Sequence, residues 1–410
     1  MRRLLLPLGL AALLLSPFVA PAQPAPAPLP LPVLTLQQAQ DLAATRNFEL
    51  SAARREVDAA DGGVRQAGAP RNPELTATVE DLRSATRTTT TTLGIPIELG
   101  GKRAARVRLA QRSRDVAQAQ LSEARSRLRA AVISAFFATV VAQERMTLSK
   151  DSASLASRAA DVVGKRVTAG KTSPVEAIRA RVDLANAQLE VAEAQAELLT
   201  AREGLAALWG DTDLAFGELV GDIAGAPAQA SAADLLAQVD ASPALVVARL
   251  DIERRQALID VERSKAAPDL TLTVGTRRDN ELGRTQAVVG VSIPLPLFDR
   301  NQGAVQEASR RVDKARDDHD AARIRLTVDV RQAATQLSTA RSSLQAIRET
   351  VLPAAQQAYD ASTTGFEAGK FSFLDVIDAQ RSLLQARARY LNTLSTAWQA
   401  ATTIDRLLGR

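Results

Sequence analysis

The sequence contains no cysteine, a single histidine (His319) and only two methionines among its 410 residues. Without cysteine, the chain has no disulfides, thiolate metal sites or cysteine nucleophiles. One imidazole leaves too few ligands for a transition-metal catalytic centre, and a Ser-His-Asp triad could use only His319. His319 stands among aspartates, where a solvated helix residue is a commoner role than a metal ligand. We therefore expect neither an enzyme nor a bound metal or other cofactor.

Aromatic residues are also scarce, at 3% of the chain, although 46% of the residues are hydrophobic. This bias favours long helices over a compact mixed core. The formal net charge is +5, and the basic residues are interleaved with Asp and Glu. Nucleic-acid-binding proteins concentrate their basic residues in patches, so we expect no nucleic-acid partner.

The N-terminus has the features of an export signal. Arg2 and Arg3 precede an apolar run over 4–15, and Ala-Pro-Ala follows at 20–22. The run is too short to cross a bilayer, which favours a signal peptide over a membrane anchor. We predict a signal peptide over 1–22 and an extended Pro-rich tether over 23–34. No later run of 18 apolar residues follows, so we expect no transmembrane helix.

The chain repeats itself at long range. PELTATV at 73–79 resembles PDLTLTV at 268–274, and Ala-Gly-Lys occurs at both 169–171 and 368–370. Such a period is far too long for a solenoid unit, so it indicates a duplicated half-molecule. We predict a first repeat over 35–210, a linker or equatorial segment over 211–230, and a second repeat over 231–410.

Each repeat has the same predicted order of helix, two strands, long helix and return helix. The strands alternate apolar and polar residues, as transmembrane β-strands do, although a half-buried soluble sheet would give the same alternation. The long helices suggest coiled coils, and Pro353 should bend the second one. The predicted ranges are helices at 35–67 and 231–266, strands at 73–82, 88–99, 268–277 and 285–297, long helices at 102–167 and 300–365, and return helices at 174–208 and 373–408.

A glycine turn ends each long helix. Gly170 and Gly369 suit a left-handed position after a helix C-terminus. Ser173 and Ser372 can then cap the return helices, with Pro174 at the first helical position of the first one.

Four strands per chain cannot close a membrane barrel, which needs about eight or more. Open sheet edges in lipid leave backbone groups unpaired, at several kcal/mol each. If the strands enter a membrane, several copies must pool them. Three copies give twelve strands, so we expect a homotrimer.

The second tip carries a resemblance to a known family. Residues 366–380 read FEAGKFSFLDVIDAQ, which is similar to the helix-tip signature Tyr-x-x-Gly-x-x-Ser/Thr-x-x-Asp-Val-Leu-x-Ala of the TolC-like outer membrane factor family. Phe366 and Ile377 replace the Tyr and Leu of that signature. The segments 96–103 and 294–303 resemble the cobalt–zinc–cadmium branch, which serves heavy-metal efflux. The matching positions are Gly369, Ser372, Asp375, Val376 and Ala379.

The resemblance implies a mainly α-helical protein with a transmembrane β part. Three chains would share a twelve-stranded barrel in the outer membrane of a Gram-negative bacterium, continued by a long periplasmic α-helical barrel. The implied partners are a periplasmic adaptor, an inner-membrane RND-type pump and outer membrane lipid. The implied cargo is heavy-metal cations such as cobalt, zinc or cadmium. Two alternatives stay open: multidrug or protein export through the same architecture, and a periplasmic coiled-coil scaffold without a pore.

The resemblance also implies site residues. Asp375 and Asp378 would line the closed periplasmic mouth as a cation-attracting gate, since residues three apart share one helix face. Asp375 could instead support the start of its helix. Phe371 and Phe373 could present apolar contacts to the adaptor or pack within the tip. The expected adaptor-docking tips are Gly170, Lys171, Ser173, Gly369, Lys370, Phe371 and Ser372.

Overall fold

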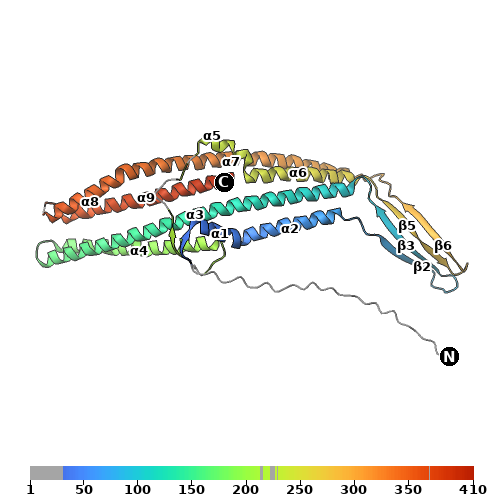
Figure 1. Cartoon of the computed structure of the whole chain (residues 1–410), viewed down its shortest axis with the longest axis horizontal. Coiled ribbons are helices and arrows are strands. Elements are labelled where there is room, and N and C mark those ends of the chain that lie inside the picture. Colours follow the sequence, from blue (N-terminus) through green and yellow to red (C-terminus); the bar gives the residue numbers. More distant parts are fainter. Residues whose placement is uncertain (1–30, 213–215, 222–226, 229, 369) are drawn as a thin grey trace, which may run out of the picture.

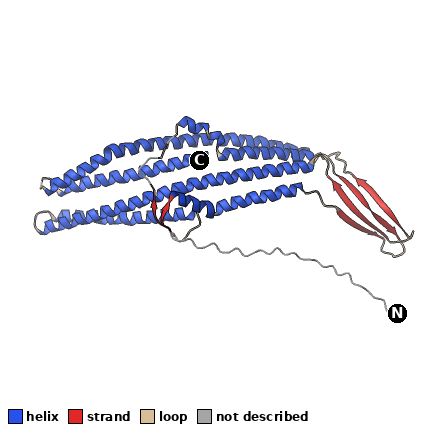
Figure 2. Ribbon diagram, viewed as in Figure 1, coloured by secondary structure: helices blue, strands red, loops and turns tan. Residues whose placement is uncertain are grey.

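The computed structural model describes residues 31–212, 216–221, 227–228, 230–368 and 370–410. The expected signal peptide and most of the expected tether lie outside these residues. Helices form a long body, with two helical hairpin tips at one end and a four-stranded sheet at the other (Figure 1, Figure 2). The first half contains β1 (Leu31–Thr35), α1 (Leu36–Arg46), α2 (Phe48–Gly68), β2 (Glu74–Glu80), β3 (Thr88–Ile97), α3 (Lys102–Thr168) and α4 (Pro174–Ala207).

The second half follows the same order after a short strand. A five-residue π-helical turn interrupts its long helix, which therefore consists of two α-helices. The elements are β4 (Phe216–Val220), α5 (Ala232–Ala237), the 3₁₀ turn η1 (Val239–Ala241), α6 (Pro243–Ser264), β5 (Leu270–Asp279), β6 (Arg284–Ser292), α7 (Gln302–Ala346), the π turn η2 (Ile347–Val351), α8 (Leu352–Glu367) and α9 (Phe373–Leu408).

The helices form a layer with α3 near its middle. Near the sheet, α3 packs between α2 and α6, and α6 packs against α7. Near the tips, α3 packs between α4 and α9, and α9 packs against α8. The layer therefore has one edge formed by α2 and α4 and another formed by α7 and α8.

Two buried clusters hold the middle of the body. One joins α5, α7 and α9, and the other joins α1, α3, the end of α4, and the short strands β1 and β4. Phe137 of α3 stacks on Trp398 of α9, with ring centroids 3.5 Å apart. This stack connects the two halves of the chain, because Trp398 packs against both clusters.

The four long strands form an antiparallel sheet in the order β2-β3-β5-β6. β3 pairs with β5, so the two hairpins join at the centre, and β2 and β6 are the edge strands. The chain then turns sharply from the sheet into α3 through Gly100 and Gly101, which both have positive φ (68° and 71°). A side chain at Gly100 would lie 2.4 Å from the Ala267 Cβ, so only glycine fits this turn.

The structure corrects several details of the predicted elements, among them the strand predicted over 285–297, which ends at Ser292. The first helix is broken at Asn47, whose side chain accepts a hydrogen bond from the Leu50 N–H (2.7 Å) and donates one to the Leu208 carbonyl (2.9 Å). The helix predicted over 231–266 is likewise broken, because buried Ser242 caps α6 at Pro243. Asn and Ser side chains can hydrogen-bond nearby backbone N–H groups, which favours the start of a new helix over continuation of the preceding one. Asn47 and Ser242 both form such caps.

The end of the predicted tether and part of the predicted linker also form regular structure. β1 and β4 pair in parallel, with Val33 opposite Glu218. The pairing is stabilised by burial, since Leu34, Phe216 and Leu219 all lie inside the core.

A further correction concerns the long helix predicted over 300–365, which is interrupted beside Pro353. This proline lies at the start of α8, directly after the π turn η2. A π turn contains one extra residue, which accommodates the missing proline N–H. At this position the long helix changes from α-helical to π-helical geometry for five residues.

Among the described residues, α3 contains one stretch long and apolar enough to cross a membrane, by length and composition only. However, 44% of that stretch is buried inside the protein. Val132, Phe136 and Val140 of α3 belong to a core cluster. Packing within the helical layer accounts for this apolar stretch.

Candidate functional site

The first tip is the turn between α3 and α4. Gly170 has φ of 68°, as its position after the helix predicts, and the Lys171 N–H donates to the Arg166 carbonyl (2.9 Å). Ser173 then caps α4 by accepting from the Val175 N–H (3.3 Å). Lys171 is exposed at the apex of the turn. The tip is therefore a closed, backbone-bonded turn that presents a cation.

The second tip is the turn between α8 and α9. The Lys370 N–H donates to the Gly365 carbonyl (2.8 Å), and Lys370 is exposed. The Phe371 ring lies against Gly365, where an added Cβ would meet ring carbons at 2.1 Å. Phe371 is nevertheless 50% exposed, so it both packs and presents apolar surface. Gly369 and the side chain of Phe373 lie outside the described residues.

The expected gate residues have different surroundings within one chain. Asp375 forms a capping box with Ser372: the Ser372 N–H donates to Asp375 Oδ2 (2.8 Å), and the Asp375 N–H donates to Ser372 Oγ (3.3 Å). These bonds to the Ser372 side chain and backbone hold the pKa of Asp375 below its usual value. Asp378 is exposed one turn further along, and within the described part its carboxylate makes no hydrogen bond or ion pair. Asp378 is thus the freer of the two carboxylates.

Two contacts that the sequence did not predict join the α3–α4 helical hairpin to the α8–α9 helical hairpin. The Arg166 guanidinium lies over the Phe366 ring, 4.5 Å from its centroid, which is within cation–π range. Arg381 of α9 forms an ion pair with Asp183 of α4. Both depend on which helices become neighbours in space, so local patterns could not have found them. They hold the two tips together inside one chain.

A cavity of about 360 Å³ lies beside these contacts, between α4 and α9. Its lining combines apolar side chains with the Asp183–Arg381 pair. The cavity is close to both tips, so a partner that grips the tips would also meet it. The apolar residues around it are Ile178, Ala180, Val182, Leu374 and Ile377.

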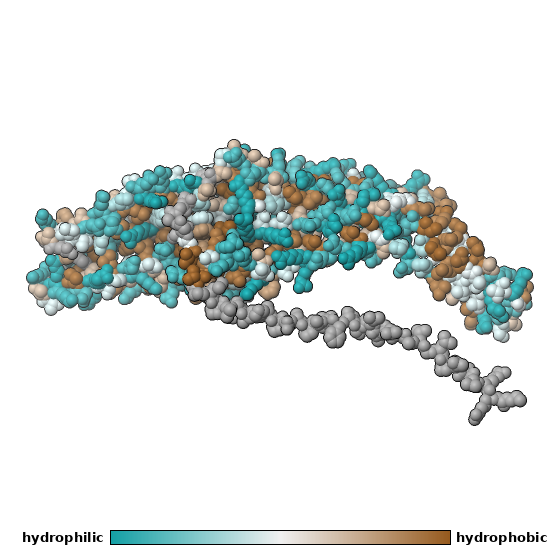
Figure 3. Space-filling model, viewed as in Figure 1, coloured by the Kyte–Doolittle hydropathy of each residue, from teal (hydrophilic) through white to brown (hydrophobic). Residues whose placement is uncertain are grey.

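The sheet at the opposite end has two unlike faces. On the apolar face, Leu75, Leu93, Val274 and Val289 lie opposite one another across all four strands. Val289 is 75% exposed, and no element among the described residues covers this face. Figure 3 shows apolar residues over the part of the sheet nearest the helices and polar residues at its far end. The next row towards the helices on the same face contains Ile95, Leu272 and Val291.

The other face of the sheet, here called the polar face, carries mainly threonine, glycine and charged side chains, with Val288 opposite Gly275 as an apolar exception. Thr76 lies opposite Thr92, Thr92 lies opposite Gly275, and Gly94 lies opposite Thr273. At Gly275 an added Cβ would lie 2.1 Å from the Thr91 carbonyl oxygen. One apolar face and one polar face is the pattern of a sheet between lipid and an aqueous lumen.

A cluster of charges stands where the sheet joins the helices. Asp269 at the start of the second hairpin binds Lys102 (Nζ–Oδ1 2.5 Å) and Arg71 (3.3 Å). Glu98 binds Arg71 (3.2 Å) and Arg106. The Asp269 contacts cross from one repeat to the other, so the cluster fixes the angle between sheet and helical body.

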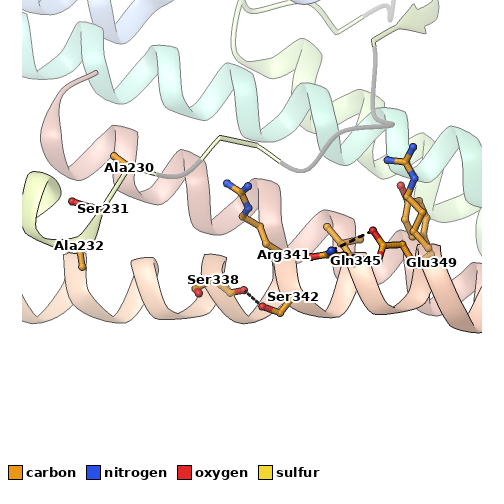
Figure 4. A pocket seen from close by; sticks show the side chains of 11 residues that line it. Ala230, Ser231, Ala232, Ser338, Arg341, Ser342, Gln345 and Glu349 are labelled. Carbon is orange, nitrogen blue, oxygen red and sulfur yellow. Dashed lines mark hydrogen bonds between the residues drawn. The ribbon is translucent and has the colours of Figure 1, made fainter.

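A larger cavity of about 670 Å³ lies beside the π turn in the helical body. Figure 4 shows Gln345 donating to Glu349 (3.2 Å) and Ser342 donating to the Ser338 carbonyl (3.2 Å). Arg341 donates to the Pro227 carbonyl (3.1 Å). The polar groups that line this cavity bind one another or the segment between the two repeats. We therefore interpret the cavity as a structural junction.

The structure shows no metal centre in the part of the chain that it describes. Among those residues no group of three or more His, Cys, Asp or Glu side chains could hold a metal ion. His319 binds its neighbour Asp320 (Nδ1–Oδ1 3.1 Å).

Comparison with known proteins gives consistent results. The sequence model described as "Outer membrane efflux protein" matches residues 39–211 and again 237–410. The cobalt-zinc-cadmium resistance protein CzcC of Cupriavidus metallidurans is 51% identical over 418 residues, covering 100% of both chains. A membrane protein from Pseudomonas aeruginosa shares the fold with a TM-score of 0.78 at 20% identity, over 91% of this chain and 92% of the other. The outer membrane protein VceC of Vibrio cholerae has a TM-score of 0.75 at 21% identity, over 91% and 96%.

Proposed function

Because the chain belongs to the outer membrane efflux protein family, we propose that it is the outer membrane channel of a tripartite pump that exports heavy-metal cations. The observation that carries this proposal is the 51% identity to a cobalt-zinc-cadmium resistance protein over the full length of both chains. The sequence contains no nucleotide-binding motif. The energy for export therefore comes from a pump in the inner membrane, and this chain supplies the passage across the outer membrane.

The sheet supports a barrel shared between copies. Its apolar face is exposed along four strands, and its edge strands β2 and β6 have no neighbour on their outer sides in the described chain. Unpaired strand edges are excluded from lipid, and four strands cannot close. Three copies joined edge to edge, β6 to β2, give a twelve-stranded barrel with the polar face towards the lumen. The alternative, a periplasmic scaffold without a pore, leaves the exposed apolar face without a role.

A helix face supports the same assembly. α4 packs on α3 through a heptad stripe that includes Ala180, Ala187 and Ala194. A second stripe of exposed apolar residues precedes the first by two positions, about 200° around the helix, and so faces away from α3. We call it the free α4 stripe. It consists of Val175, Ile178, Val182, Ala185, Leu189, Ala192, Ala196 and Leu199.

A heptad stripe over seven turns is the pattern of a helix with a second coiled-coil partner. The free α4 stripe lies at one edge of the helical layer, and α7 and α8 form the other edge. In a closed ring of identical copies, one edge meets the other. α8 exposes small side chains that let a bulky stripe approach closely, namely Ala354, Ala358 and Ala361.

The tips are the proposed docking site for the periplasmic adaptor. Both turns present a lysine, at Lys171 and Lys370, and the second also presents half-exposed Phe371. Asp375 and Asp378 would converge around the threefold axis as the gate. Asp378 carries the larger part of that role, because Asp375 is engaged by Ser372.

Export is tested in a strain that retains the adaptor and pump but lacks this chain. Such cells should retain more cobalt, zinc and cadmium than cells that express it, as measured by mass spectrometry of washed cells. Expression of the chain from a plasmid should restore export. Unchanged metal content, together with lost efflux of an organic dye, would favour multidrug export instead.

A further inference from the structure

Phe48 is a large aromatic residue at the α2 edge of the helical layer. It is the first residue of α2 and is 78% exposed. The ring lies against Gly210, where an added Cβ would come within 2.8 Å of a ring carbon. α2 packs on α3 with Leu50 buried, and Phe48 precedes Leu50 by two positions, about 200° around the helix. The aromatic side chain is therefore directed away from the layer.

The other edge of the layer has an apolar patch on α7. α7 packs inward through Leu326 and Val330, which are buried. Ile324 and Val328 each precede one of these residues by two positions, so they face outward, and they are 67% and 54% exposed. We call these two residues the α7 patch. Single exposed apolar residues need no special explanation, so the meaning of the patch depends on what lies opposite it.

Phe48 and the α7 patch lie at the same level along the body. Figure 1 shows the start of α2 and the middle of α7 at one level between the tips and the sheet. The buried clusters agree with this, because Ala43 belongs to one cluster, Leu326 belongs to the other, and Trp398 packs against both. In a ring of copies around the long axis, each edge meets the other edge of the next copy without a change of level. Phe48 would then lie opposite the α7 patch of that copy.

The next positions along the two helices also match. α2 runs towards the sheet and α7 runs away from it, so the two helices would be antiparallel across the contact. With Phe48 opposite Ile324, one heptad further along brings Arg55 opposite Asp317. Both charged side chains are exposed, and neither has a hydrogen bond or ion pair within the described chain. The same alignment that covers the aromatic ring would thus pair a free cation with a free carboxylate.

A second heptad brings a pair of glycines to the contact. Gly62 and Gly63 are exposed, and nothing lies within 4 Å of an added Cβ at either one. Glycine weakens a helix interior relative to alanine, so two in succession suit a position that another chain approaches closely. Ala52 and Ala59 also keep this face of α2 small. The residue opposite Gly62 would be Arg310, and the missing Cβ atoms leave room for its long side chain.

We propose that α2 of one copy packs antiparallel against α7 of the next, with Phe48 on the α7 patch and Arg55 paired with Asp317. The partner is a second copy of this chain. This inference rests on the proposed ring of copies. It adds a contact on the sheet side of the body, whereas the free α4 stripe serves the side near the tips.

The contact also fixes the register between copies. A shift by one heptad in either direction would place Phe48 opposite Asp317 or Arg331 instead of the α7 patch. Burying an aromatic ring against a charged side chain costs the charge its water, so those alignments are disfavoured. Phe48 therefore selects one alignment of neighbouring copies along the long axis.

Pairs of introduced cysteines test the contact, since the chain has no native cysteine. The in-register pairs are Phe48→Cys with Ile324→Cys, and Arg55→Cys with Asp317→Cys. The swapped pairs, Phe48→Cys with Asp317→Cys and Arg55→Cys with Ile324→Cys, use the same positions one heptad, or about 10.5 Å, out of register. A disulfide needs Cα atoms within about 7 Å of each other. Because α3 and α6 separate α2 from α7 within one chain, such a disulfide would link two copies.

Membranes from cells that express each variant are oxidised with copper phenanthroline and analysed by denaturing electrophoresis. The in-register pairs should give covalent trimers, and the swapped pairs should remain mostly single chains. The mass of the extracted, unsubstituted protein is measured alongside by light scattering. If that mass is three chains but the in-register pairs link no more than the swapped pairs, α2 does not meet α7 in this register and the inference fails alone. If that mass is one chain, the proposed ring is wrong and the inference fails with it.

Discussion

At the scale of single residues, the two aspartates of the second tip differ in what holds them. The carboxylate of Asp375 is bonded to Ser372, whereas Asp378 faces solvent without a partner in the described chain. Their three-residue spacing predicts a shared face, but it gives no means of telling a helix cap from a gate. The capping box shows that Asp375 supports the start of α9, and a gate role for either aspartate stays a proposal.

Replacing Asp378 with Asn should weaken block of the channel by divalent cations several-fold in planar bilayers, and cation selectivity should fall. Three like charges around a narrow axis repel one another and attract cations, and the substitution removes all three. Replacing Asp375 with Ala should in addition loosen the start of α9, seen as faster hydrogen exchange there. If a channel with both residues changed to Asn keeps its block and selectivity, the gate lies elsewhere.

At the scale of elements, the tips depend on turn chemistry that is visible in the sequence. Ser173 and Ser372 cap α4 and α9, as Ser before a helix predicts, and Gly170 has the positive φ expected of it. These features are local, so propensity and capping rules suffice for them. The break at Asn47, the β1–β4 pairing and the Asp183–Arg381 pair all need knowledge of distant neighbours, and local rules missed them.

Replacing Gly170 with Val should destabilise the first tip by about 1–2 kcal/mol, because φ of 68° is strained for a β-branched residue. Nothing lies within 4 Å of an added Cβ there, so the cost is in the backbone alone. Crosslinking of the tip to the adaptor should fall, while the protein still assembles in the membrane. Gly164→Ala is the control: this helical glycine is equally open, and alanine should leave crosslinking unchanged.

At the scale of the whole molecule, the proposed assembly is inferred from surfaces that one chain leaves uncovered. The alternating strands predict a sheet with an apolar face, and its exposure on β2, β3, β5 and β6 agrees with that. The free α4 stripe is also present in the sequence as a heptad. The sequence alone could not distinguish it from the other α4 stripe, which packs on α3 and includes Ala180, Ala187 and Ala194, because both stripes have the same period.

Replacing Leu189 with Glu should shift detergent-extracted protein from the mass of three chains towards one. Leu189 is 63% exposed in the single chain, so the substitution disturbs no internal packing. In the trimer the same carboxylate would be buried at an apolar contact, which costs several kcal/mol. Light scattering coupled to size-exclusion chromatography measures the mass. Gln188→Glu adds the same charge beside the stripe and should leave the trimer intact; equal dissociation in both variants would remove α4 from the contact.

The open edges of the four-stranded sheet also determine when folding can finish. A single chain can complete its helical layer, with its own buried clusters, before it meets another copy. In the proposed trimer the sheet is completed only by other copies, because β2 and β6 are its edge strands in the described chain. Insertion, strand pairing and association of the copies would then form one concerted step. Until that step, the open edges and the exposed apolar face would have to be kept from pairing with unrelated strands.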